Sequence, residues 1–129
     1  MMFFDGAARQ EGAGVGVVFV SPQWQILLYS FSLSELCSNN VAEYQALIIG
    51  LQMAIKMGIL QLEMFGDSKL VINQILEQYD VKKEDPVPYC KYVKKLLANF
   101  KAITLEYIPR KENRQADALA NLATALALY

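Results

Sequence analysis

Histidine is absent from this sequence, and cysteine is rare, with Cys37 and Cys90 the only two among 129 residues. Without histidine, the chain cannot build a Ser-His or Cys-His nucleophilic site or a His-ligated zinc centre. Two cysteines supply neither a zinc site of four thiolates nor a dense disulfide framework. We therefore expect a protein of a reducing compartment, intracellular in the cytoplasm or the nucleus and not secreted.

Long apolar runs are missing as well. The most apolar segment, residues 48–62, is interrupted by two glutamines and a lysine, and it falls short of the roughly 20 apolar residues that span a bilayer. The apolar residues 1–4 follow no basic region, so they are not a signal peptide. Since a typical domain holds roughly 100–200 residues, we expect one monomeric domain over residues 1–129 that does not bind a membrane.

The formal net charge is only −1, from 12 basic and 13 acidic side chains, but the two signs are segregated along the chain. Residues 1–81 carry three basic and eight acidic side chains, whereas residues 82–114 carry nine basic and four acidic ones. The second block is a candidate phosphate-binding surface, whose affinity for nucleic acid would fall with salt. For each lysine taken singly, an ordinary solvated helix face is the alternative.

Hydrophobic periodicity predicts strands in the first third of the chain and alternating helices and strands in the rest. We expect strands at 1–7, 15–20 and 24–33, a helix that follows 38–40 and ends at Gly58, a strand at 61–65, helices after 66–68 and through 93–100, a strand at 102–108, a polar loop at 109–113 and a closing helix at 114–128. This order describes an α/β layer fold whose later strands are parallel. Trp24, Tyr29 and Phe31 are either core residues or surface platforms, and because aromatic residues suit a strand we expect them in the core.

Four carboxylates occupy positions where a solvated charge is not expected. Asp5 lies inside the apolar first strand, Asp67 follows the fourth strand, and Glu43 and Asp117 lie early in helices. Three of them have a simpler interpretation, because acids in a first helical turn are favoured by the macrodipole and Asp67-Ser68 is typical of an N-cap. Asp5 is the exception, since an unpaired carboxylate inside a strand is costly.

If the four carboxylates converge, their mutual repulsion calls for cations, and Mg²⁺ or Mn²⁺ suits an all-oxygen ligand set. Two such ions roughly 4 Å apart would activate a water and stabilise the leaving oxygen in phosphodiester hydrolysis. This chemistry needs no histidine.

The four carboxylates lie in motifs that follow one another along the chain: Asp5-Gly6-Ala7, the run from Ser38 to Leu47, Gly66-Asp67-Ser68, and the run from Glu112 to Ala120. Together with the glycine-rich opening of the second strand, these motifs resemble type 1 ribonuclease H. They are most similar to the ribonuclease-H-like domain of plant retrotransposon polyproteins. The resemblance covers essentially the whole chain and fills all four acidic positions of the family.

The resemblance implies a three-layer α/β fold, a five-stranded mixed sheet flanked by helices, with the first three strands antiparallel and the later ones parallel. It implies endonucleolytic hydrolysis of the RNA strand of RNA–DNA hybrids by two Mg²⁺ ions, with Mn²⁺ as the other candidate. The catalytic metal ligands would be Asp5, Glu43, Asp67 and Asp117. The domain would either work alone or form part of a larger polyprotein that includes a reverse transcriptase.

By the same resemblance, Asn39 and Asn40 match amides that contact the minor groove and the 2′-hydroxyls, the group that distinguishes RNA from DNA. Ser38 matches a residue that holds a DNA-strand phosphate, and Gly6 would let the hybrid backbone approach closely. Helix capping is the alternative for residues 38–40, and turn formation is the alternative for Gly6.

The sequence departs from the family in two places. The family's loop histidine, which assists product release, is missing, and Arg110 or Lys111 is the candidate replacement through pairing with a phosphate. The basic segment that longer members use to bind the hybrid is short. Its lysines are Lys82, Lys83, Lys91, Lys94 and Lys95.

Two other functions stay open at this point. A non-catalytic module of a polyprotein would bind hybrids or duplexes without hydrolysing them, although a decayed site usually loses a carboxylate first. A related metal-dependent nuclease or exonuclease on the same fold would act on another nucleic acid.

Overall fold

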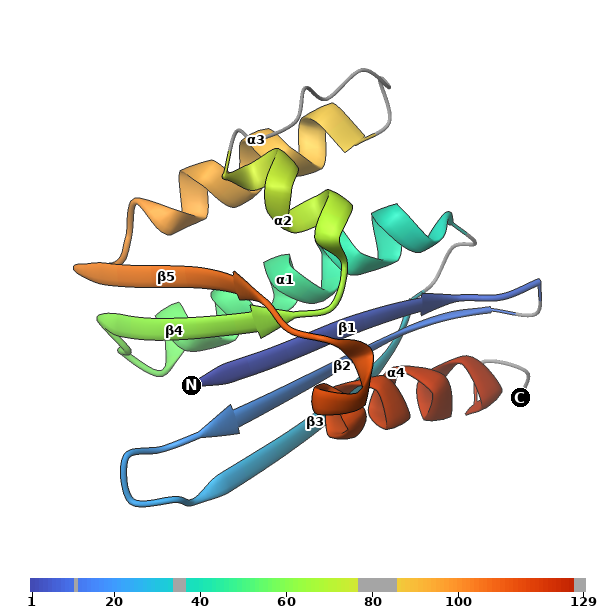
Figure 1. The fold of residues 1–129 in the computed structure, drawn as a ribbon, viewed down its shortest axis with the longest axis horizontal. Coiled ribbons are helices and arrows are strands. Elements are labelled where there is room, and N and C mark those ends of the chain that lie inside the picture. Colours follow the sequence, from blue (N-terminus) through green and yellow to red (C-terminus); the bar gives the residue numbers. More distant parts are fainter. Residues whose placement is uncertain (11, 34–36, 77–85, 127–129) are drawn as a thin grey trace.

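The structure is a computed structural model that describes residues 1–10, 12–33, 37–76 and 86–126 (Figure 1). Lys82 and Lys83 lie outside these ranges. The elements are β1 (Met2–Ala8), β2 (Ala13–Val20), β3 (Ile26–Leu33), α1 (Asn39–Lys56), β4 (Gln61–Gly66), α2 (Lys69–Ile75), α3 (Pro86–Leu97), β5 (Ala102–Tyr107), the short 3-10 helix η1 (Arg110–Glu112) and α4 (Arg114–Leu126). Within the described ranges, no helix is both long enough and apolar enough to cross a membrane.

The strands form a five-stranded mixed sheet with the order β3-β2-β1-β4-β5. The β1–β2 and β2–β3 pairs are antiparallel, whereas the β1–β4 and β4–β5 pairs are parallel. The predicted sheet, antiparallel first and parallel later, is therefore confirmed. Because β1 and β4 are parallel neighbours, their carboxyl ends meet at one edge of the sheet, where open α/β folds usually place their sites.

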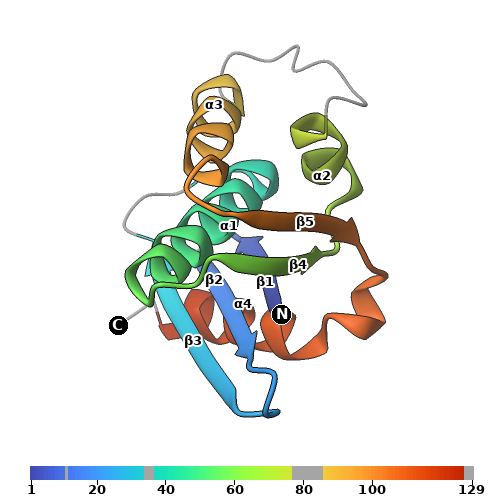
Figure 2. The same ribbon diagram turned by 90° about the vertical axis from the view of Figure 1, so that its left-hand side faces the viewer.

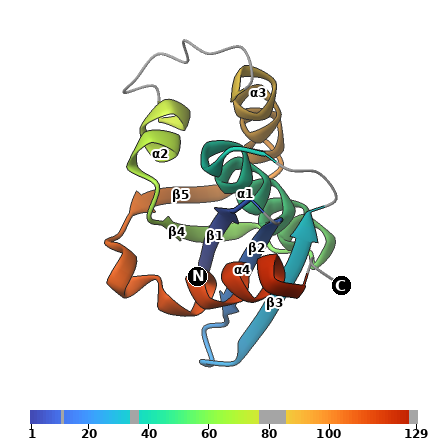
Figure 3. The same ribbon diagram turned by 90° about the vertical axis from the view of Figure 1, so that its right-hand side faces the viewer.

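Helices cover both faces of the sheet and produce the predicted three layers, with α1, α2 and α3 on one face and α4 on the other (Figures 1, 2 and 3). The core fills the space between the sheet and the first group of helices. Alternate strand residues and one side of α1 contribute its fully buried members, among them Phe4, Val15, Val17, Tyr44 and Leu47.

On the opposite face of the sheet, β2 and β3 present small residues to α4, which lets this helix approach closely. Gly14 and Gly16 of β2 have no room for a Cβ atom, because backbone oxygens of α4 already occupy that space. Ser30 and Ser32 of β3 donate hydrogen bonds of 2.6 and 3.0 Å to further α4 carbonyl oxygens. These contacts fix α4 on the sheet and thereby place Asp117, in its first turn.

The expectation that the β3 aromatics are buried is wrong for two of them. Trp24 precedes the strand, lies in the turn after β2 with a left-handed φ of 63°, and is 75% exposed. Phe31 is also exposed, while Tyr29 is partly buried against the core. Phe31 lies on β3 at the edge of the sheet, where a strand has a neighbour on one side only, whereas Trp24 lies outside the strand altogether.

Several further boundaries differ from the predicted ones: β2 begins at Ala13, β3 begins at Ile26, and α1 ends at Lys56. α3 ends at Leu97, and Phe100 follows it in a tight turn while still packing against the core. The polar loop at 109–113 contains η1, a single turn of 3-10 helix. Apart from η1, which is too short to show a periodic pattern, these differences concern the ends of elements, where periodicity carries little information.

The substitution Gly16→Ala is expected to lower the free energy of unfolding by about 3 kcal/mol, because the added methyl group must push the α4 backbone away from the sheet. Gly50→Ala in α1 is the matched control. There the new atom meets the flexible end of Met2, and alanine is the better helix former, so we expect a change below about 1 kcal/mol. Urea unfolding followed by circular dichroism measures both, and native stability of Gly16→Ala would contradict the close packing of α4.

Candidate functional site

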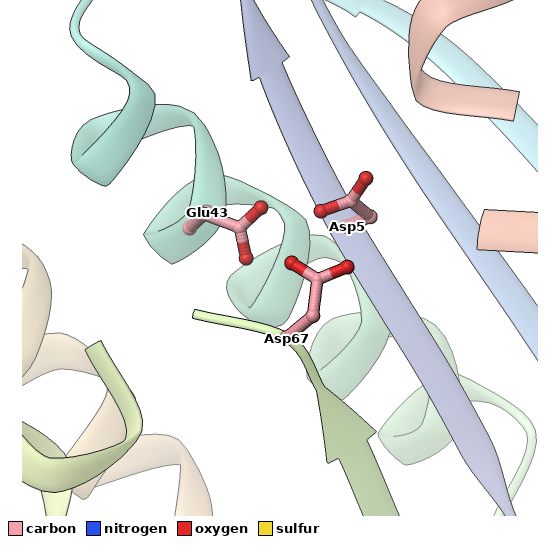
Figure 4. Close-up of side chains that lie close together, drawn as sticks. All are labelled: Asp5, Glu43 and Asp67. Atoms are coloured by element: carbon pink, nitrogen blue, oxygen red, sulfur yellow. The ribbon is translucent and has the colours of Figure 1, made fainter. Parts of the chain in front are cut away.

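Three carboxylates from three different elements converge beside the carboxyl ends of the central strands (Figure 4). Asp5 comes from β1, Glu43 from the second turn of α1, and Asp67 directly follows β4. One oxygen atom of each lies within 4.8 Å of the other two. Asp5 and Glu43 are only 2% and 5% exposed, so two of the three charges are largely removed from water.

Glu43 owes its position to the close contact between β1 and α1. Gly6 packs directly against the α1 backbone at Ala42, where a Cβ atom has no room. The Gly6 N–H donates a 2.8 Å hydrogen bond to Glu43 Oε1. The other oxygen, Oε2, is buried and has no hydrogen-bond partner among the described residues. Because buried polar atoms are normally hydrogen-bonded, this oxygen is a candidate ligand atom for a cation.

Burial and crowding disfavour negative charge on these carboxylates. Burial, followed by the neighbouring Glu43, Asp67 and Asp117 carboxylates, raises the pKa of Asp5 to about 11. Burial, with a smaller contribution from the Asp67 charge, also raises the pKa of Glu43, although the Asp5 carboxyl, the Gly6 N–H and the charge of Arg110 partly oppose this. Carboxylates this close cannot all be ionised at neutral pH unless a cation lies among them.

Asp117 adds a fourth carboxylate at the rim of the cluster. It is half-buried in the first turn of α4, within hydrogen-bond reach of Asp5. The Asn121 amide donates to Asp117 Oδ1 at 3.1 Å and to its carbonyl oxygen at 2.9 Å. Arg9 in turn donates a hydrogen bond to Asn121 Oδ1. The structure thus brings together all four carboxylates singled out in the sequence.

A groove of about 580 Å³ opens over these carboxylates. All four line it, as do four of the predicted substrate-contacting residues, namely Gly6, Asn39, Asn40 and Arg110. Three further polar residues, which the sequence analysis did not identify, are Arg9, Ser68 and Asn121. The remaining predicted contacts lie outside the lining: Ser38, Lys91, Lys94, Lys95 and Lys111.

The contacts also decide between capping and other roles. Ser38 caps α1 by accepting a 3.2 Å hydrogen bond from the backbone of the first turn. Ser68 caps α2 in the same way at 3.3 Å, so Asp67 is not the N-cap of that helix. Asn39 accepts a 2.9 Å hydrogen bond from the Ala8 N–H through its Oδ1 atom. The capping interpretation therefore holds for Ser38 and, in the Asp67-Ser68 pair, for Ser68, whereas the Asp67 carboxylate takes no part in capping.

Of the groove residues that the sequence analysis did not identify, Asn121 had a signal in the sequence and Arg9 had none. Asp117 and Asn121 stand four positions apart on one helix, a spacing that places side chains on the same face and could have indicated their contact. Arg9 has no such signal, because it meets Asn121 only where the end of β1 passes α4 in the folded chain.

The donor set fits a divalent cation with oxygen ligands. The cluster consists of carboxylates alone, it contains an unpartnered buried oxygen, and its charges repel one another. Carboxylate oxygens suit both Mg²⁺ and Mn²⁺. Asp5, Glu43 and Asp67 are the residues placed to hold such an ion.

Asp5→Asn is expected to stabilise the metal-free protein. In EDTA at neutral pH we expect the free energy of unfolding to rise by about 1–3 kcal/mol, because the variant removes a carboxyl that folding forces to remain protonated. The raised pKa means that the folded state binds this proton more tightly than the unfolded state does, from pH 3.8 up to about 11. The destabilisation that results from keeping Asp5 protonated in the folded state therefore grows as the pH rises, and it shrinks as the pH falls toward 3.8, the pKa of an ordinary Asp.

The measurement is urea unfolding of both proteins in EDTA at several pH values. We expect the stability gap between Asp5→Asn and the native chain to narrow as the pH falls from 8 to 5. Glu63→Gln, at an exposed position on β4, is the control and should show no such gap. A native chain that equals Asp5→Asn in stability at pH 8 would contradict the crowding described above.

Comparison with known proteins places this arrangement in context. The family of reverse transcriptase-like domains matches residues 3–123. The sequence is 37% identical to a bifunctional protein of Mycobacterium tuberculosis over 120 residues, or 91% of this chain. It is also 37% identical to ribonuclease HI of Halobacterium salinarum over 123 residues, or 94% of this chain. The chain spans only 33% and 62% of the length of these two relatives.

Solved structures share the fold over nearly the whole chain. Ribonuclease H1 of Halobacterium salinarum superposes with a TM-score of 0.91 at 35% identity, over 96% of both chains. The N-terminal ribonuclease H domain of the Mycobacterium tuberculosis protein gives a TM-score of 0.89 at 33% identity, over 98% of this chain and 94% of that one. LC11-RNase H1, solved in complex with an RNA/DNA hybrid, gives 0.89 at 29% identity, over 99% and 98%. Taken with the family match, these similarities establish that the chain belongs to the ribonuclease H-like family.

Proposed function

We propose that this chain is an endonuclease that hydrolyses the RNA strand of RNA–DNA hybrids, using two divalent cations held by Asp5, Glu43, Asp67 and Asp117. The observation that carries the proposal is the buried carboxylate cluster, with its unpartnered Glu43 oxygen, at the floor of a groove. Relatives named as ribonuclease HI or H1, one of them solved with a bound hybrid, support the same activity.

Each carboxylate has a distinct part in the proposed site. Asp5, Glu43 and Asp67 would hold one ion, and Asp117, within reach of Asp5, would hold the second together with it. Mg²⁺, with Mn²⁺ as the alternative, would lower the pKa of a water nucleophile and neutralise the charge that develops on the leaving oxygen. Glu43 is fixed by the Gly6 N–H at Oε1, which leaves Oε2 for the ion or its water.

Amides and arginines along the groove are suited to position the nucleic acid. Because Asn39 Oδ1 is held by the Ala8 N–H, its NH₂ group is left to donate to acceptors in the minor groove or to a 2′-hydroxyl. Asn40 lies next to it in the lining. Arg9 and Arg110 are exposed cations of the same groove and would pair with phosphates, Arg110 in place of the family's loop histidine.

Gly6 and Ser38 take structural roles in the folded chain, and the contacts proposed for them with the hybrid come in addition. Gly6 lets β1 touch α1, and Ser38 caps that helix. Lys111 lies outside the groove, next to Arg110 on η1. Lys91, Lys94 and Lys95 lie on α3 and would meet the hybrid beyond the groove.

The proposal extends to the setting of the domain. Attachment to a reverse transcriptase in a larger polyprotein is supported by the matching family of reverse transcriptase-like domains. The particular similarity to plant retrotransposons stays a prediction. The non-catalytic module is the second candidate function, and the complete set of four carboxylates favours catalysis over it.

Asp67→Asn tests the proposed reaction directly. The native chain with Mg²⁺ is expected to cleave the labelled RNA strand of a hybrid, and to leave duplex RNA and duplex DNA intact. Removing a direct ligand should reduce the cleavage rate by more than the roughly 10–100-fold that loss of an outer-shell partner causes. Gel analysis of the labelled strands measures both effects.

Glu106→Gln, at an exposed position on β5, is the matched control and should cleave at the native rate. Equal cleavage by Asp67→Asn and the native chain would refute the assignment of Asp67. A native chain that binds the hybrid tightly but leaves it uncleaved, with or without EDTA, would favour the non-catalytic module. Cleavage of duplex DNA or RNA in preference to the hybrid would favour a related nuclease.

A salt titration tests the proposed α3 contacts. On the non-cleaving Asp67→Asn background, replacing Lys91 and Lys95 by Gln should reduce the slope of log affinity against log salt by roughly 2, if each lysine neutralises one phosphate. Lys56→Gln, at the far end of α1 from Asn39, is the control. Identical slopes for the double variant and the control would show that α3 does not contact the hybrid.

A further inference from the structure

Asn113 stands between η1 and α4 and is 1% exposed. Its Nδ2 group donates two hydrogen bonds, one of 2.9 Å to the Phe4 carbonyl oxygen and one of 3.2 Å to Asp67 Oδ2. Its own carbonyl oxygen accepts a 3.0 Å hydrogen bond from the Asp117 N–H. One residue therefore touches the backbone next to Asp5, the carboxylate of Asp67 and the backbone of Asp117.

Helix capping does not explain this side chain. A capping asparagine uses its side-chain oxygen to accept a hydrogen bond from the first turn of the helix. Asn113 Oδ1 is instead buried with no hydrogen-bond partner in the described part of the chain. The bonds that the side chain does make run to β1 and to the residue after β4, both far away in the sequence.

Direct contact with a substrate does not explain it either, because Asn113 is buried and does not line the groove. Both hydrogens of its amide are used, one on the β1 backbone at Phe4 and one on the carboxylate of Asp67, directly after β4. A side chain without an NH₂ group in this place would leave the Phe4 carbonyl oxygen and one Asp67 oxygen without this donor. Asp67 would then be held less firmly against the repulsion of Asp5 and Glu43.

We propose that Asn113 is a positioning residue that fixes Asp67 and Asp117 relative to β1 and thereby sets the affinity of the site for divalent cations. The inference rests on the metal-binding part of the proposed function. It assigns Asn113 an effect on the metal site and none on contact with the hybrid.

Calorimetry of Mn²⁺ binding, without nucleic acid, tests the proposal. We expect the Kd of Asn113→Ala for Mn²⁺ to rise at least tenfold over the native value, as is typical when an outer-shell partner of a metal ligand is lost. Asn113→Leu keeps most of the volume and should show the same loss, which separates the hydrogen bonds from a cavity effect. The affinity of each variant for the hybrid in EDTA should stay at the native value.

Gln74→Leu is the control, because it removes another buried hydrogen-bonded amide, the acceptor of the 2.6 Å bond from the Tyr44 hydroxyl, and neither residue lines the groove. It should lower stability while leaving the Kd for Mn²⁺ unchanged. A Kd within twofold of the native value in either Asn113 variant would overturn the inference, as would an equal loss in Gln74→Leu. A native chain that binds no Mn²⁺ would instead refute the proposed function.

A measurement on the native chain keeps the inference testable if the variants do not fold. In NMR spectra, the side-chain NH₂ of Asn113 should exchange with solvent far more slowly than that of the exposed Asn99, and its signals should shift as Mg²⁺ is added. Exchange as fast as that of Asn99, or signals that ignore Mg²⁺, would overturn the inference.

Discussion

The carboxylate of Asp5 lies in the centre of a buried strand, and the surrounding structure depends on how that charge is accommodated. Glu43 and Asp67 bring two more acids within 4.8 Å, in a place where burial already disfavours ionisation. Repulsion alone would drive these side chains apart. They stay together because β1 is held against α1 at Gly6, while Gly16 lets α4 sit directly on the neighbouring strand. The close backbone contacts of the fold thus hold the carboxylates so near to one another that a cation would be needed for all of them to be ionised.

The site consists of carboxylates and of asparagines that donate hydrogen bonds to two of them. In the proposed site the carboxylates would bind the cations. Asn113 bridges β1 and Asp67, and Asn121 donates to Asp117 from the next turn of α4. Since α4 carries Asn121 and begins directly after Asn113, its close packing on the sheet fixes one side of the site. Stability of this helix and geometry of the site are therefore linked.

Much of the fold followed from the sequence, because strands with β-branched residues and helices with periodic apolar residues are local patterns. The order of elements, the mixed sheet and the four acidic positions were predicted on that basis and on the resemblance. The exposure of Phe31 on β3 was not predicted, since periodicity does not say which strand lies at an edge. Trp24 was wrongly placed in the strand and in the core. Asn113 was missed because its partners, Phe4 and Asp67, become neighbours only through the tertiary fold.

Anomalous diffraction from crystals grown with Mn²⁺ is the most direct test of the central claim that these carboxylates form a cation site. The account predicts an anomalous peak among the carboxylate oxygens of Asp5, Glu43 and Asp67, and its loss in Asp5→Asn crystals grown under the same conditions. Crystals saturated with Mn²⁺ that show no peak at this position, with the carboxylates still clustered, would contradict the account.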